Sequence, residues 1–165
     1  MTITIILTIT GCILLFLMIL DATLTLPSSS LIKYFPEDVQ KKLKSRLENL
    51  PLTPKRIAGC IILVLLGLAW LALFFVGGFL GRADRFTFIN HLIRFLIIGF
   101  GIKLFDIVCL DFILLTKTKF FQHFFPETKD CKGWHQFGYN RKQQIKQCVS
   151  IFIFCIAMTA GFTFL

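Results

Sequence analysis

The chain has 165 residues, of which 56% are hydrophobic and 16% charged, and its formal net charge at pH 7 is +9. Ordinary soluble domains carry about 25% charged residues. The apolar residues here form long runs without polar faces, which excludes a soluble fold of amphipathic elements. Most lysines and arginines flank these runs, where such residues set membrane topology, and no nucleic-acid-binding module is present. The sequence therefore predicts an all-α integral membrane protein.

The first apolar run predicts a transmembrane helix over residues 4–26. A run of about 18 or more apolar residues, at roughly 1.5 Å per residue, crosses a hydrocarbon core of about 30 Å. Pro27 and the serines that follow it end the helix. No charged side chain precedes the run, so we expect a retained helix and not a removable signal peptide. This extent places Asp21 in the inner leaflet.

A loop over residues 27–56 follows, and it contains a predicted short amphipathic helix over residues 37–50. Pro36 suits its first turn. Four apolar side chains fall within an arc of about 80°, with lysines on the other side; they are Val39, Leu43, Leu47 and Leu50. The helix can lie on the membrane with its lysines toward anionic lipid, or pack on the rest of the protein. Both placements stay open.

The next two apolar stretches predict helices over residues 57–80 and 86–116, joined by a tight turn. The first is rich in glycine and alanine, which let helix backbones approach closely in lipid. Its Gly77-x-x-x-Gly81 motif fits internal packing as well as dimerisation. A second long loop over residues 117–145 precedes the last predicted helix, over residues 146–165. The sequence thus predicts a single membrane domain, a four-transmembrane-helix bundle.

The distribution of Lys and Arg predicts the orientation of this bundle. Seven such residues lie from Asp21 to Arg56, two in the turn after the second helix, and seven from Lys117 to Lys146. Because positive residues accumulate in cytoplasmic loops, both long loops are expected on the cytoplasmic side of the cell membrane. The N- and C-termini are then both outside.

The third predicted helix contains the strongest chemical signal, because charged residues interrupt its apolar stretch. At about 100° per residue, Asp106 lies about −60° and Asp111 about +80° from Lys103, so the three share one broad face. Charges in a membrane normally face the protein interior and find partners. Lys103 and Asp106 are spaced for an i, i+3 salt bridge. His91 and Arg94 lie nearer the outer end, where Arg94 can snorkel to the interface.

The carboxylates of this region outnumber its cations. Asp21 and Asp111 are expected at similar depths, with Asp106 one to two turns deeper. Three carboxylates against one lysine can bind a proton, a cation or a basic substrate. The alternative is structural: Lys103–Asp106 is a buried ion pair, and Asp21 and Asp111 are interfacial caps.

The second candidate site lies in the loop after the third helix, where cationic residues alternate with aromatic ones. Such a surface suits the level of the lipid headgroups. His123 and His135 are its candidate ligand-binding residues. With Cys131 they form His-x7-Cys-x3-His, a spacing that matches no familiar closed zinc site, so no metal is predicted and no cofactor is indicated.

These features predict a small polytopic membrane protein that binds or passes a small ligand, ion or proton through a polar cluster in the cytoplasmic half of the bundle. A membrane-embedded enzyme acting on a lipid or lipophilic substrate is an alternative, in which Asp106 or Asp111 would be the acid or base. A structural or accessory subunit is another. The expected partners are the bilayer, with anionic lipid at the cytoplasmic face, and either further copies of the chain or a membrane complex. No nucleic acid is expected.

Overall fold

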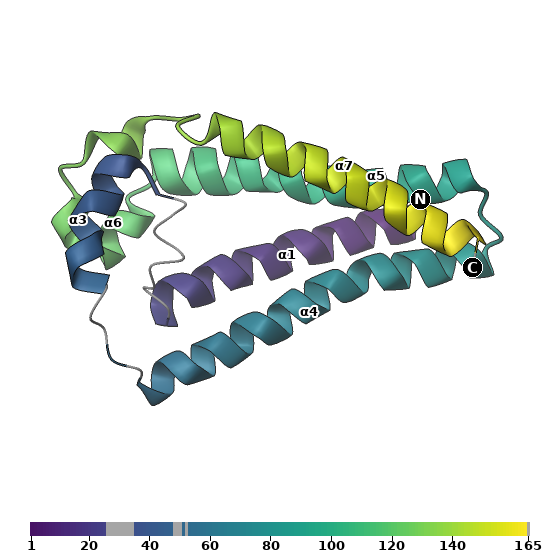
Figure 1. Cartoon of the computed structure of the whole chain (residues 1–165), viewed down its shortest axis with the longest axis horizontal. Coiled ribbons are helices and arrows are strands. Elements are labelled where there is room, and N and C mark those ends of the chain that lie inside the picture. The colour runs from purple at the N-terminus through teal and green to yellow at the C-terminus, as the bar shows by residue number, and fades with distance from the viewer. Residues whose placement is uncertain (26–34, 48–50, 52, 165) are drawn as a thin grey trace. The chain divides into compact units, whose positions relative to one another are not determined.

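The computed structural model describes residues 1–25, 35–47, 51 and 53–164, and all regular elements in this part of the chain are helical (Figure 1). In chain order they are α1 (Thr2–Thr25), α3 (Glu37–Leu47), α4 (Pro54–Ala83), α5 (Phe88–Phe105), the π-helix η1 (Asp106–Lys117), α6 (Phe120–Phe124), the 3-10 helices η2 (Pro126–Thr128) and η3 (Lys132–His135), and α7 (Arg141–Phe164).

Three of the described helices, α1, α4 and α7, are long and apolar enough to cross a membrane. The fourth long helix is α5, which continues directly into η1. Large apolar side chains are exposed along the candidate spans, including Ile13, Leu68 and Ile153, which are 54%, 59% and 61% exposed. Surfaces of this kind are stable against lipid and not against water. The chain is therefore a small helical integral membrane protein.

The helices extend beyond the apolar runs that predict them. Helix α4 begins at Pro54, three residues before the expected start, because proline suits the first turn of a helix. Helix α7 begins at Arg141, and its first turns hold polar residues with good helix propensity. The third helix changes from α to π geometry at Asp106, where bonds from residue i to i+5 replace the i to i+4 pattern.

The structure consists of two compact units, each with its own internal contacts. The first unit comprises Met1–Leu15, Leu66–Asp106 and Lys142–Leu165. Its described part brings segments of α1, α4, α5 and α7 around one core, which consists of Leu7, Phe74, Phe95, Ile98, Ile102 and Cys155. Phe74 packs on the rings of Phe95 and Phe154, and the thiol of Cys155 donates to the carbonyl oxygen of Phe95 at 3.3 Å.

Three glycines near the end of α4, Gly77, Gly78 and Gly81, lie in this first unit. A Cβ at Gly77 would lie 3.4 Å from side-chain atoms of both Leu7 and Ile98, and a Cβ at Gly78 would overlap the ring of Phe162. The absence of a side chain at Gly78 therefore lets Phe162 of α7 approach the backbone of α4, whereas a Cβ at Gly77 would make only ordinary contact with α1 and α5. At Gly81, the second glycine of the Gly77-x-x-x-Gly81 motif, a Cβ would lie 2.6 Å from His91 Cε1 on α5, so this position packs within one chain.

The second unit comprises Phe16–Leu65 and Ile107–Arg141. Its core joins α3 to the end of η1 and the segment that follows, and it consists of Phe35, Val39, Leu43, Leu115, Phe121, Phe125, Cys131 and Trp134. Val39 and Leu43 are fully buried, so the apolar face of α3 packs on protein at these positions. The Leu47 side chain and Leu50 lie outside the described residues. The carboxylate of Asp38 accepts a hydrogen bond from the Gly133 amide at 2.9 Å, which ties α3 to η3.

Candidate functional site

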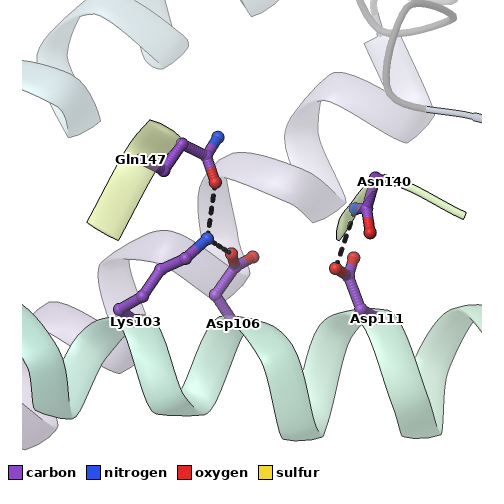
Figure 2. Close-up of polar contacts among 5 residues, drawn as sticks. All are labelled: Lys103, Asp106, Asp111, Asn140 and Gln147. Atoms are coloured by element: carbon purple, nitrogen blue, oxygen red, sulfur yellow. Dashed lines mark hydrogen bonds and ion pairs between the residues drawn. The ribbon is translucent and has the colours of Figure 1, made fainter. Parts of the chain in front are cut away.

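Lys103 and Asp106 form a salt bridge on the third helix. The ammonium of Lys103 lies 2.6 Å from Asp106 Oδ2 and also donates to the side-chain oxygen of Gln147 on α7 (Figure 2). Lys103 is 6% exposed and Asp106 23%. The structure thus brings together two predicted site residues and adds Gln147, for which the sequence contained no signal because the pairing depends on how α5 meets α7.

Asp111 lies in the second unit and bonds to a residue of the second long loop. Asn140 donates from its side-chain amide to Asp111 Oδ2 at 3.0 Å (Figure 2). Thr116 donates from its hydroxyl to the Asp111 carbonyl oxygen at 2.7 Å, five residues back, as the π geometry of η1 requires. Asp111 therefore ties η1 to the residues that lead into α7.

Asp21 is held near the end of α1, also in the second unit. Its Oδ1 accepts a hydrogen bond from the Thr25 hydroxyl at 3.2 Å, whereas its Oδ2 is buried and has no hydrogen-bond partner among the described residues. A Cβ at Gly59 would overlap the Thr25 side chain, so the backbone of α4 lies directly against this turn of α1. Thr25, the residue that bonds to Asp21 Oδ1, is thus packed against α4.

His123 and His135 line one open groove in the second unit. The groove has a volume of about 460 Å³, and its other lining residues are Lys119, Gln122 and Lys129. Lys119, Gln122 and Lys129 were not among the predicted site residues. The alternation of basic and aromatic residues could have indicated them, because each lies within a few positions of a ring that enters the core.

Cys131 does not join the two histidines. It is 5% exposed and belongs to the core of the second unit. Burial raises the pKa of its thiol, and the positive charge of Lys42 partly offsets this effect. In the described part of the chain, no group of three or more His, Cys, Asp and Glu side chains is arranged to hold a metal ion.

Arg94 and His91 form a further polar cluster in the first unit. Arg94 is 3% exposed, donates to the Gly77 carbonyl oxygen at 2.8 Å and lies 3.7 Å from Asp84. Its guanidinium carbon is 4.1 Å from the ring centroid of Phe86. His91 is 1% exposed, and its Nδ1 has no hydrogen-bond partner among the described residues. Arg94 thus turns inward to protein partners instead of snorkelling outward.

Comparison of the chain with protein-family models, with curated proteins and with solved structures found no significant match.

Proposed function

We propose that the chain is a four-span membrane protein that binds a proton or a small cation in the half of its bundle nearest the long loops, with Asp21 as the binding group. In this arrangement α5 and η1 form the fourth span. Both long loops are cytoplasmic, and both termini are outside. The observation that carries the proposal is the buried Oδ2 of Asp21, which has no hydrogen-bond partner among the described residues.

The physical argument rests on the free energy of burying charge. An ionised carboxylate oxygen removed from water and left unpaired is strongly unfavourable, more so inside a membrane than at a protein surface. A bound proton or a bound cation removes this penalty. Asp21 lies on α1, a candidate span, and its hydrogen-bond donor Thr25 packs against Gly59 of α4. One chain of this size is narrow, so conduction would require several copies.

Carbodiimide labelling tests the proposal, because hydrophobic carbodiimides react with protonated carboxyl groups within membranes. We expect dicyclohexylcarbodiimide to modify Asp21 in the folded, reconstituted chain, with the site located by mass spectrometry. Asp84, whose side chain is 54% exposed, is the internal control and should remain unmodified. The Asp21→Asn variant should lose the modification while its melting temperature stays close to that of the unmodified sequence.

Added cations distinguish the two ligands. If Na⁺, K⁺ or Ca²⁺ slows the labelling of Asp21 in a saturable manner, the site binds that cation in competition with the proton. If labelling is independent of these cations, the site is a proton site. Asp21 that reacts no faster than Asp84 would show that its carboxylate is neither protonated nor sequestered, and the proposal would be wrong.

A structural or accessory role is the second candidate, and it is favoured by a different observation. Lys103 bonds to Asp106 on its own helix and to Gln147 on α7, so its charge serves to join two helices. An enzyme would use Asp106 or Asp111 as acid or base. Both carboxylates already accept hydrogen bonds from neighbouring side chains, so the contacts favour the binding and structural roles over catalysis.

A further inference from the structure

The groove that contains His123 and His135 is lined by basic side chains and one amide, all of which can donate hydrogen bonds. Two lysines, two histidines and a glutamine surround about 460 Å³, and no carboxylate among the described residues lines it. Lys119 precedes α6, Gln122 and His123 belong to α6, Lys129 follows η2, and His135 ends η3. Three short elements thus direct polar side chains into one space of a size typical of small-ligand sites.

An aromatic core holds these three elements in place. The rings of Phe121 and Trp134 stack at 5.9 Å with planes 4° apart, which fixes α6 against η3. The Trp134 indole donates to the Thr128 carbonyl oxygen at 3.0 Å, which fixes η2 against η3. Thr128 and Trp134 are both at most 1% exposed. The groove is therefore preorganised, so a ligand does not have to order it.

The donors of the groove suit an anion with more than one negative charge. Lys119 and Lys129 repel cations, so the two imidazoles are poorly placed to bind a metal. The Gln122 side chain, 6% exposed, adds an amide donor that needs no charge. Charge-assisted bonds to phosphate oxygens are stronger than neutral ones, and several donors that converge on one group favour a dianion over a carboxylate.

We propose that this groove binds a phosphate monoester. Helix η1 ends at Lys117, two residues before the first lining residue, so a span that ends there would place the groove at the level of the headgroups. Phosphatidic acid presents a phosphate monoester at that level, and a soluble phosphorylated compound presents the same group from the cytoplasm. This site is distinct from Asp21; its place at the headgroups rests on the proposed topology, whereas binding of the phosphate does not depend on Asp21.

Native mass spectrometry of the full chain in detergent measures this binding by titration with phosphatidic acid, with phosphatidylcholine as the reference lipid. The Lys119→Gln, Lys129→Gln double variant should bind phosphatidic acid at least about tenfold more weakly. The Lys119→Arg, Lys129→Arg variant should retain binding. The matched control is Lys41→Gln with Lys132→Gln, which removes the same charge from the neighbouring groove around Asp38 and should weaken binding less than about twofold.

Modification of His123 and His135 by diethylpyrocarbonate distinguishes the two sources of phosphate. Protection by inorganic phosphate at millimolar concentration assigns the groove to soluble phosphate compounds. Protection by phosphatidic acid alone assigns it to the lipid headgroup. The proposal is overturned if neither probe protects the histidines, or if the control variant loses phosphatidic acid binding as fully as the groove variant while both melt like the parent chain.

Discussion

At the scale of single residues, Lys103 illustrates how a charge is accommodated inside this protein. Its ammonium is buried between α5 and α7, with one carboxylate and one amide oxygen as partners. Removing one partner of a buried pair leaves an uncompensated charge, which costs more than replacing both partners by apolar groups of similar size. The effect of substitutions at this pair on stability therefore depends on whether one partner or both are changed.

The Asp106→Asn variant should lower the free energy of unfolding by about 2–3 kcal/mol, less than for a fully buried pair because Asp106 is partly exposed. The double variant Lys103→Met with Asp106→Leu should restore stability close to that of the parent chain. Thermal melting in detergent provides the measurement. A parent-like melting temperature for Asp106→Asn would mean that the salt bridge does not form in the protein.

Arg94 is a second buried charge that is accommodated by partners within the protein, here the Gly77 carbonyl oxygen and Asp84. Its position near the outer end of the third helix allowed the side chain to reach outward to the interface. The structure instead directs the guanidinium to the Gly77 carbonyl oxygen on α4. A Cβ at Gly81 would lie 3.2 Å from Arg94 Nη1 and 2.6 Å from His91 Cε1. The absence of a side chain at Gly81 thus accommodates both polar side chains.

At the scale of elements, the amphipathic helix α3 packs its apolar face against the second long loop. Its apolar positions Val39 and Leu43 are completely buried against aromatic residues that lie more than 70 positions later in the chain. The Asp38 carboxylate also accepts a hydrogen bond from the Gly133 amide. The helix is thus part of the core of the second unit, and the Cys131 thiol lies in the same core.

Replacing Leu43 by aspartate should open this core, because burial of a leucine contributes about 1.5–3 kcal/mol and a buried carboxylate costs more. Alkylation of Cys131 measures the change. Only the thiolate reacts, and burial raises the pKa of this thiol, so the native protein should react slowly at pH 8 and faster as the pH rises. In the variant, the pH 8 rate should increase at least about tenfold.

The control for this experiment is Lys41→Asp, which places the same charge on an exposed position of α3 and should leave the rate nearly unchanged. Raising the pKa of the thiol also has a consequence for stability. The stabilisation from keeping Cys131 protonated is complete below the pKa of the unfolded thiol and is lost as the pH rises through the raised pKa of the folded thiol. Equal alkylation rates in the Leu43→Asp variant and the parent chain would mean that α3 does not cover Cys131.

At the scale of the whole molecule, orientation follows from counts of seven, two and seven Lys and Arg residues across the three connections. Single cysteines introduced at Ala83 and before Met1 should react with an impermeant maleimide in intact cells, whereas one at Ser45 should react only after the membrane is permeabilised. If the cysteine at position 45 reacts with the maleimide in intact cells, the orientation is the opposite of the one proposed. Each of these variants also needs a parent-like melting temperature.

The sequence by itself determined the membrane character and the approximate positions of the long helices. Both depend on local properties: the length of an apolar run, the glycines and prolines at its ends, and the charges that flank it. The i, i+3 spacing of Lys103 and Asp106 was also readable, because both residues lie on one helix and their distance follows from helix geometry.

Only the tertiary structure decided which partners these residues have. Gln147 and Asn140 are 44 and 29 positions from the residues they bond to, so no local spacing identifies them. The choice of protein over lipid for Val39 and Leu43 required the aromatic residues of the later loop. The groove around His123 exists because Phe121 and Trp134 stack across three short elements. Such contacts arise from side-chain packing between distant segments, which local propensity does not specify.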